Sequence, residues 1–122
     1  MQFRDPTAIY EQISDYGIEQ ILLGNWLPEE RIPSVRGLAA ELGVNPNTVQ
    51  RAYADLDAAG LLYNERGRGF FVAADGPREA RTLRRKAFVE QKLPRLAADL
   101  HLLQIDHDEL ISLLQQLQNQ PS

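Results

Sequence analysis

Apolar side chains recur at helical spacing near the start of the chain. The run follows Asp5-Pro6, a pair that suits a helix cap and first helical position, and it stops at Gly24, a residue type that often ends a helix. Gly17 lies inside the run and is a weak helix former. The spacing predicts a first helix with one apolar face, formed by Ile9, Ile13, Ile18, Ile21 and Leu22.

Two further apolar stripes follow an extended connector over residues 25–33, whose Trp26 and Leu27 are expected in the core. Ser34 suits the cap of a short second helix that Gly43 closes. Asn45 and Pro46 suit the start of a third helix that stops at Gly60. The inward faces are expected to be Val35, Leu38, Ala39 and Leu42 in the second helix, and Val49, Ala52, Tyr53 and Leu56 in the third.

Two short apolar runs, at residues 61–63 and 70–72, flank a turn that contains Gly67 and Gly69, and this pattern predicts a β-hairpin. Residues 73–77 break the pattern again. We therefore expect two parts, a helix-turn-helix with a hairpin wing over residues 1–75 and a helical tail over residues 76–122. The fold class is mainly α with a small β-hairpin, a winged helix-turn-helix.

The tail has apolar positions at alternating spacings of four and three, which is the pattern of a helix that faces a partner. Pro94 lies inside this seam and predicts a bend near Glu90. Asp106 and Glu109 resemble the capping box of a last helix. Two such helices cannot bury their apolar faces alone, so we expect them to pair two protomers through Val89, Leu93, Leu96, Leu100, Leu103, Leu110, Leu113, Leu114 and Leu117.

The third helix has an outward face that is polar at its beginning and nearly bare further along. If Val49 and Tyr53 point inward, then Asn47, Arg51 and Ala54 point outward at 100° per residue. A helix that reads the major groove of DNA needs polar side chains in its first turns and little bulk beyond them. This pattern favours DNA binding.

Net charge is the one bulk property that opposes a nucleic-acid partner. The formal charge is -4, and residues 1–75 hold six Arg against eleven Asp or Glu. Affinity for DNA comes largely from neutralised phosphates, so basic side chains must gather locally. Three of the carboxylates belong to the first helix, at Glu11, Asp15 and Glu19, while four arginines lie in later segments, at Arg36, Arg51, Arg66 and Arg68. A bipolar module is consistent with both observations.

Several segments match a known signature in both residues and spacing. They are Ile32-Pro33-Ser34-Val35-Arg36, Leu38-Ala39, Leu42-Gly43-Val44-Asn45-Pro46-Asn47-Thr48-Val49 and Gly67-Arg68-Gly69. Together they resemble the GntR-type regulators, and the resemblance covers roughly residues 5–73. The short helical tail is similar to that of the YtrA-like branch. Three residues depart from the family pattern: Pro46 stands for an arginine of some members, Glu30 for a glycine and Phe70 for a threonine.

The resemblance implies a transcription regulator, with repression the favoured sign, that binds an inverted-repeat operator in double-stranded DNA as a homodimer. It implies that Gly67 and Arg68 of the wing reach the minor groove or backbone, and the neighbouring Arg66 is a further candidate contact. The other implied operator contacts are Arg36, Asn47, Thr48, Gln50 and Arg51. No cofactor is expected, and the chain offers no sign of a small-molecule effector's identity.

Other functions are less well supported by the residues. A winged-helix module that binds protein and not DNA is the main alternative, because the first part is net acidic. A ligand-gated regulator is a third hypothesis, although the tail has few polar groups that could orient a ligand. His101 and His107 lack metal-site spacing, and no nucleophile has an adjacent base, so neither a metal site nor an enzyme is expected. No cysteine, signal peptide or membrane span is apparent, which favours the cytoplasm.

Overall fold

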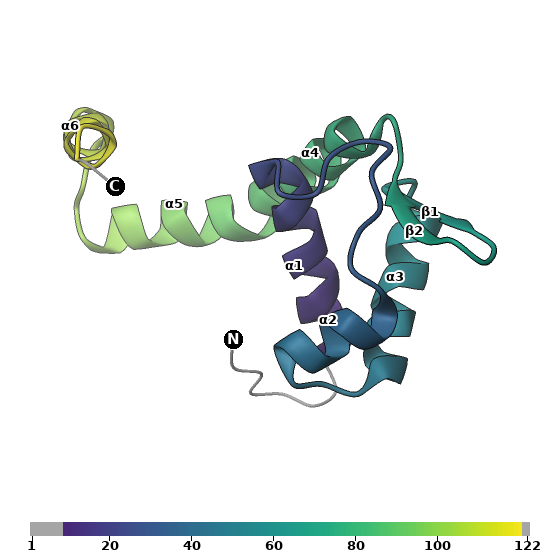
Figure 1. Cartoon of the computed structure of the whole chain (residues 1–122). Helices are drawn as coiled ribbons and strands as arrows, with labels where there is room; N and C mark the ends of the chain where they lie inside the picture. Colours follow the sequence, from purple (N-terminus) through teal and green to yellow (C-terminus); the bar gives the residue numbers. More distant parts are fainter. Residues whose placement is uncertain (1–8, 121–122) are drawn as a thin grey trace. The chain divides into compact units, whose positions relative to one another are not determined.

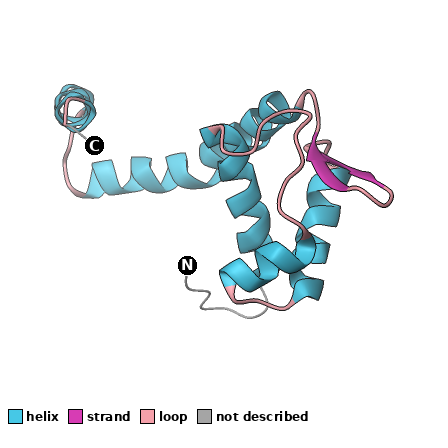
Figure 2. Ribbon diagram, viewed as in Figure 1, coloured by secondary structure: helices cyan, strands magenta, loops and turns pink. Residues whose placement is uncertain are grey.

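The computed structural model describes residues 9–120, so the expected cap at Asp5 and Pro6 lies outside the described residues. The chain is mainly helical with one two-stranded antiparallel hairpin, as the sequence predicted (Figures 1 and 2). In chain order the elements are α1 (Ile9–Leu23), α2 (Val35–Leu42), α3 (Pro46–Ala58), β1 (Leu62–Glu65), β2 (Gly69–Val72), α4 (Gly76–Ala87), the π-helical turn η2 (Phe88–Lys92), α5 (Leu93–Leu102) and α6 (His107–Gln118).

The expected caps of α2 and α3 are confirmed. The Ser34 hydroxyl accepts a hydrogen bond of 3.0 Å from the Gly37 amide, and Gly43 ends α2 in the left-handed conformation with φ 69°. The Asn45 side chain accepts a hydrogen bond of 2.8 Å from the Asn47 amide, and Pro46 opens α3. These local bonds satisfy helix-end groups that would otherwise lack partners, so the chain turns sharply between α2 and α3.

A chain of aromatic contacts runs through the core and joins four elements. Trp26 of the connector lies edge-on to Tyr16 of α1 and to Tyr53 of α3, with ring centroids 6.1 and 6.3 Å apart. Tyr53 continues the chain to Phe70 of β2 at 5.1 Å. Edge-to-face pairs of this kind add to the stabilisation from burial. They therefore fix α3 against both α1 and the hairpin.

Gly17 of α1 lies where α1 closely approaches α3 and the connector. A Cβ built there would lie 2.8 Å from Cδ1 of Leu56 and 3.3 Å from the Trp26 ring. The glycine that weakens the helix in sequence terms thus admits α3 and the connector. The apolar stripes expected in α1 and α3 are buried at Ile13, Ile18, Ile21, Val49, Ala52, Tyr53 and Leu56.

The connector pairs with the hairpin, which the sequence did not predict. The Ile32 amide donates to the Phe70 oxygen (3.0 Å) and the Val72 amide donates to the Glu30 oxygen (3.1 Å). Trp26 is buried as expected, but Leu27 is 46% exposed. Leu27 is the first residue of a tight turn that the Glu30 amide closes on its oxygen, and its side chain remains in solvent.

A tight turn begins the part of the connector that pairs with the hairpin. In this turn, Glu29 has the left-handed backbone conformation, with φ 68°. The Glu30 amide closes the turn on the Leu27 oxygen at 3.1 Å, and Pro28 holds the position before Glu29. Proline followed by a residue of positive φ is typical of a tight turn that favours glycine at that second place. The position suited to glycine is therefore Glu29, one residue before the place that the resemblance gave it.

The chain divides into two compact units, one ending at Arg84 and one beginning at Arg85. This division lies later than the boundary expected after residue 75, because the start of α4 packs on the hairpin. Gly76 and Ala80 are buried, and a Cβ on Gly76 would lie 2.8 Å from Cγ1 of Val72. Farther along α4, the Arg84 guanidinium donates to the Asp15 backbone oxygen at 3.1 Å.

In the second unit, the residues around Glu90, where the sequence predicts a bend, form a π-helical turn. The Leu93 amide donates to the Phe88 oxygen, five residues back, in place of the usual four. A proline cannot donate and crowds the carbonyl four residues earlier, so a wider turn at this place relieves the conflict. The start of α6 follows the sequence prediction, because the Asp106 carboxylate accepts a hydrogen bond of 2.8 Å from the Glu109 amide.

Candidate nucleic-acid interface

Helix α3 has a buried side and an exposed side, divided as the spacing predicted. Its inward residues Val49 and Tyr53 are 0% and 1% exposed. The candidate DNA contacts Asn47, Gln50 and Arg51 are all exposed, as is Ala54 one turn further on, while Thr48 is partly buried. The first turns of α3 therefore present polar side chains to solvent from a rigid support.

Charge is distributed unevenly along α3. No acidic residue lies in its first turn, where the helix dipole favours a negatively charged partner. Arg51 lies in the middle of the helix, and the exposed carboxylates Asp55 and Asp57 lie near its end. A polyanion is thus attracted to the beginning of α3 and repelled from its last turn.

Helix α2 is held at a fixed place against α3 by a buried tyrosine. The Tyr53 hydroxyl donates a hydrogen bond of 2.7 Å to the Pro33 oxygen, just before the cap of α2. Burial raises the pKa of Tyr53, and the nearby Tyr16 and Glu41 raise it further, so the hydroxyl keeps its proton. Arg36, in the first turn of α2, is exposed to solvent.

The hairpin turn contains the three wing candidates, all of them exposed. Gly67 has φ 80°, a conformation that other residues adopt at a cost. Arg68 forms an ion pair of 2.6 Å with Glu65, and its guanidinium carbon lies 5.3 Å from the centre of the Phe71 ring. Arg66 is exposed beside them. The sequence indicated a basic wing tip, but it did not indicate that a carboxylate already occupies Arg68.

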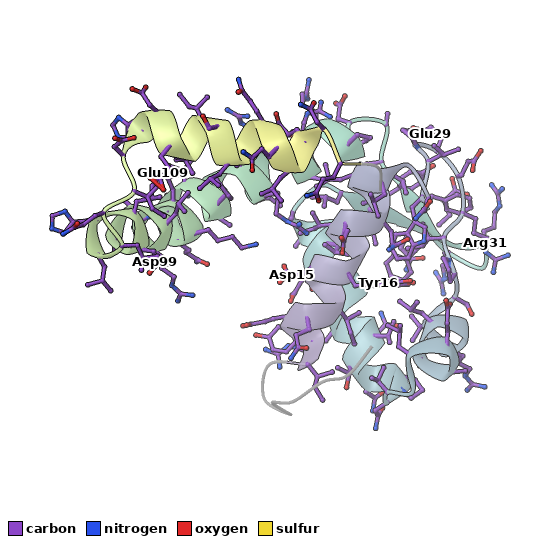
Figure 3. All side chains as sticks on the ribbon, turned by 90° about the vertical axis from the view of Figure 1, so that its left-hand side faces the viewer. Asp15, Tyr16, Glu29, Arg31, Asp99 and Glu109 are labelled. Carbon is purple, nitrogen blue, oxygen red and sulfur yellow. The ribbon has the colours of Figure 1, made fainter. Side chains whose placement is uncertain are left out.

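Partial burial raises the pKa of Tyr63 in β1, and the hydrogen bond of 3.1 Å that its hydroxyl donates to Glu29 raises it further. Figure 3 labels Glu29 together with Arg31, both of them connector side chains. Arg31 packs against the start of β2, since a Cβ on Gly69 would lie 3.1 Å from its Nε. The pairing of Arg31 with Phe71 places this exposed arginine at the base of the wing. No local sequence pattern singles it out, because the pairing joins distant segments.

A second contact that sequence reasoning missed involves Arg51. Its guanidinium carbon lies 3.6 Å from the centre of the Tyr10 ring in the first turn of α1. The two residues are distant in sequence and belong to different helices, so only the packing of α1 against α3 reveals the pair.

The second unit exposes much of its apolar surface. Most of the residues expected at a protomer interface are more than a third exposed, and Leu100 and Leu110 are partly buried. The exposed ones are Val89, Leu93, Leu96, Leu103, Leu113, Leu114 and Leu117, and Phe88, Leu102 and Ile111 add to the same kind of surface. Exposed apolar side chains in such number are typical of a surface that another molecule covers.

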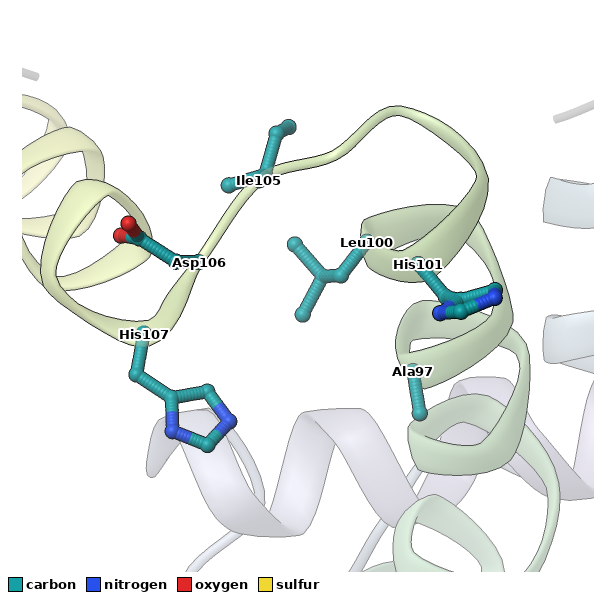
Figure 4. Close-up of a pocket in the computed structure, with 6 residues that line it drawn as sticks. All are labelled: Ala97, Leu100, His101, Ile105, Asp106 and His107. Carbon is teal, nitrogen blue, oxygen red and sulfur yellow. The ribbon is translucent and has the colours of Figure 1, made fainter.

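The second unit also contains a cavity of about 340 Å³ beside the turn between α5 and α6 (Figure 4). Its lining is Ala97, Leu100, His101, Ile105, Asp106 and His107. The Asp106 carboxylate already caps α6. Within residues 9–120, no cluster of three or more His, Cys, Asp or Glu side chains could hold a metal ion.

Comparison with known proteins finds transcription regulators both by sequence and by structure. The sequence profile described as "Bacterial regulatory proteins, gntR family" matches residues 9–72. The chain is 33% identical to the HTH-type transcriptional repressor YtrA of Bacillus subtilis, over 88% of this chain and 82% of that protein. It is 39% identical to the uncharacterized HTH-type transcriptional regulator YhcF of the same organism, over 59% of this chain, and that match spans 60% of YhcF.

Solved structures of transcription regulators superpose on this chain. A GntR family transcriptional regulator from Listeria monocytogenes superposes with a TM-score of 0.77 at 32% identity, covering 93% of this chain and 98% of that one. The structure of AraR(DBD) in complex with operator ORX1 superposes with a TM-score of 0.54 at 34% identity, covering 59% of this chain and 93% of that one. Among the described residues, no helix is both long and apolar enough to cross a membrane.

Proposed function

Because the chain belongs to the gntR family of bacterial regulatory proteins, a family of helix-turn-helix transcription regulators rather than enzymes, we propose that it binds an inverted-repeat operator as a homodimer and represses transcription. The first unit binds the operator, and the tail pairs the protomers. The observation that carries the proposal is the exposed beginning of α3, with Asn47, Gln50 and Arg51 in solvent above a fully buried stripe.

Each group of exposed polar side chains has a distinct task in this proposal. Asn47, Gln50 and Arg51 enter the major groove, where arginine and asparagine-type side chains distinguish bases by paired hydrogen bonds. Arg36 contacts the phosphate backbone from the start of α2. Arg66, Gly67 and Arg68 reach the adjoining backbone or minor groove from the wing. The partly buried Thr48 contributes its hydroxyl at the edge of the group.

Support for this arrangement comes from the match of the first unit to AraR(DBD), a protein solved in complex with an operator. The charge distribution agrees, since the exposed carboxylates Asp55 and Asp57 are at the far end of α3. The net charge of -4 is compatible because Asp15 and Glu19 lie in later turns of α1, beyond the first turn that contacts Arg51. A DNA phosphate therefore meets local positive charge on an acidic protein.

The homodimer is supported by the tail. Helices α5 and α6 expose a row of leucines that a protein of this size does not keep in water without a partner. A second copy offers the same surface, and a twofold axis lets each apolar face cover the other. Two recognition helices on such an axis fit successive major grooves about 34 Å apart, which calls for an inverted repeat. Repression is proposed because YtrA, which matches along most of the chain, is described as a repressor.

Selection of duplexes from a random pool tests the proposal, with the full-length protein as bait and the double variant R36A/R51A as matched control. The expected result is enrichment of one inverted repeat whose half-site centres lie about one helical turn, roughly 10 base pairs, or a multiple of it apart. The control should enrich nothing. Failure of the folded wild-type protein to enrich any duplex, together with passage through heparin at low salt without retention, would instead favour a protein-binding module.

A reporter gene placed behind the selected repeat then tests the sign of regulation. Repression predicts lower expression when the protein is present and recovery with the R36A/R51A control. Higher expression with the wild-type protein would contradict repression while leaving operator binding in place.

A further inference from the structure

Tyr10 is the residue that contacts the side chain of Arg51. It lies in the first turn of α1, and the Arg51 guanidinium carbon is 3.6 Å from its ring centre. Cation–π contacts are effective within about 6 Å of the ring centre, so this pair is well inside the range. Arg51 is exposed, and Tyr10 is partly buried. The partly buried ring of Tyr10 thus lies against the exposed guanidinium cation of Arg51.

We propose that Tyr10 is a positioning residue that holds the Arg51 guanidinium ready to read a base. The inference rests on the function proposed above, in which Arg51 enters the major groove. It assigns to α1 a part in sequence recognition, although α1 is outside the helix-turn-helix.

The geometry leaves the guanidinium free to act. A ring beneath the guanidinium occupies one face of the plane, whereas the five N–H donors point outward in the plane of the group. Paired hydrogen bonds to the O6 and N7 atoms of guanine use those in-plane donors. The polar end of Tyr10 has its own partner, since its hydroxyl donates to the Glu11 carboxylate at 3.2 Å. The ring face is therefore the part of Tyr10 that meets Arg51.

Positioning of this kind improves affinity through entropy. A free arginine side chain loses many rotamers when it binds, and that loss weakens the complex. A side chain already restrained by the ring loses fewer rotamers. The effect is specific to the base pair that Arg51 contacts, so removal of the ring should relax selectivity at that base pair and leave the rest of the operator preference unchanged.

The first test examines the free protein by NMR. The Hε resonance of Arg51, assigned by its disappearance in R51K, should be displaced by the ring current of Tyr10. The displacement should persist in Y10F, which keeps the ring, and vanish in Y10L. An Hε resonance at the same position in the wild type and in Y10L would overturn the inference without any reference to DNA.

The second test is a double-mutant cycle on the duplex selected by the wild-type protein, with dissociation constants from fluorescence anisotropy and folding checked by thermal unfolding. Y10F should bind within about twofold of wild type, and Y10L about threefold to tenfold more weakly. In the R51A background, Y10L should change affinity by less than about twofold. If Y10L does not fold, Y10M, which also lacks a ring, takes its place.

Three outcomes would overturn the inference. Y10L could weaken R51A as much as it weakens wild type, which would make the two residues independent. Y10F could bind as weakly as Y10L, which would assign the effect to the hydroxyl. Y10L could bind more tightly than wild type, which would mean that Tyr10 withholds Arg51 from DNA. Absence of binding by the wild-type protein would remove the proposed function and this inference with it, whereas wild-type binding without coupling would remove the inference alone.

Discussion

The hydroxyl of Tyr53 donates a hydrogen bond of 2.7 Å to the backbone oxygen of Pro33. This bond joins the middle of α3 to the residue that precedes the cap of α2. The tyrosine is 1% exposed, and its ring also contacts Trp26 and Phe70. One side chain thereby fixes the distance between the two helices of the helix-turn-helix and connects both to the hairpin.

Removal of that hydroxyl should destabilise the first unit without altering its surface. The substitution Y53F leaves the Pro33 oxygen without its donor, and we expect a loss of about 1–2 kcal/mol in the free energy of unfolding. Urea titration followed by tryptophan fluorescence measures this loss, since Trp26 belongs to the same core. The partly buried Tyr16 provides the control, with Y16F expected to cost less than about 0.5 kcal/mol. Equal losses in the two variants would contradict the role given to the hydrogen bond.

The same residue predicts a dependence of stability on alkaline pH. Burial raises the pKa of Tyr53 above its ordinary value of about 10. Below that pH the tyrosine is protonated in both the folded and unfolded chain, and its full contribution is present. Above it the unfolded chain loses the proton first, so stability falls by about 1.4 kcal/mol per pH unit from this group. The stability difference between wild type and Y53F, measured by urea titration from pH 8.5 to 11, should therefore shrink above pH 10. A constant difference would be inconsistent with a protected hydroxyl.

Arg51 and Arg36 should affect operator binding in different ways. We expect R51A to cost about 1–3 kcal/mol and to relax the preference at one base pair, because a base contact is lost. R36A should weaken binding to all sequences and reduce the slope of affinity against salt by about one unit, because a phosphate contact is lost. Anisotropy titrations at several salt concentrations separate the two effects. R78A is the matched control, since Arg78 is exposed on α4 and pairs with Asp75, and unaltered binding by both R51A and R36A would speak against the assignment.

Glu65 should weaken binding of the wing to DNA, because its carboxylate already pairs with Arg68. Its carboxylate forms the 2.6 Å ion pair with Arg68 and adds negative charge beside the hairpin turn. We predict that E65Q increases affinity for the operator by about twofold to fivefold at low salt, because Arg68 becomes free to meet a phosphate. E79Q removes the same charge from α4 and should change affinity little. If E65Q and E79Q have the same effect on the dissociation constant, net charge and not the release of Arg68 is responsible.

A charge placed on the apolar face of α6 should separate the protomers. Leu114 is 45% exposed in the isolated chain and is one of the residues assigned to the dimer. L114E would place a carboxylate in the apolar contact, so we expect a mainly monomeric protein by analytical ultracentrifugation at micromolar concentration. S112E adds the same charge on the opposite side of α6, because two residues turn the helix by about 200°, and it should remain dimeric. A wild-type protein that sediments as a monomer would exclude the proposed pairing.

Local chemistry made much of the fold predictable. Ser34 and Asn45 predict the starts of helices because their side chains accept hydrogen bonds from amides only two or three residues away. The buried stripe of α3 follows from helical periodicity, and the hairpin follows from its glycines. The candidate contacts on α3 could be named for the same reason, since the inward face defines the outward one.

Most of the features that sequence reasoning missed depend on segments far apart in the chain. The ion pair of Arg68 is local, but nothing in the residue order ranks Glu65 above solvent as its partner. Pairing of Arg31 with Phe71, and stacking of Arg51 on Tyr10, arise only when distinct elements pack. The exposure of Leu27 beside the buried Trp26 is likewise set by tertiary packing. Periodicity carries no information about such choices.

The pairing of the connector with the hairpin also bears on how the protein stays apart from its neighbours in a crowded cell. Strand β2 has β1 on one side and the segment around Glu30 and Ile32 on the other, so its backbone groups are used on both sides. An open strand edge is a template on which another chain can polymerise. On the other side of β2, the four residues of β1 include Asn64 and Glu65, which suit a strand poorly. A segment that looks like a mere linker thus protects the wing against fibril-like association.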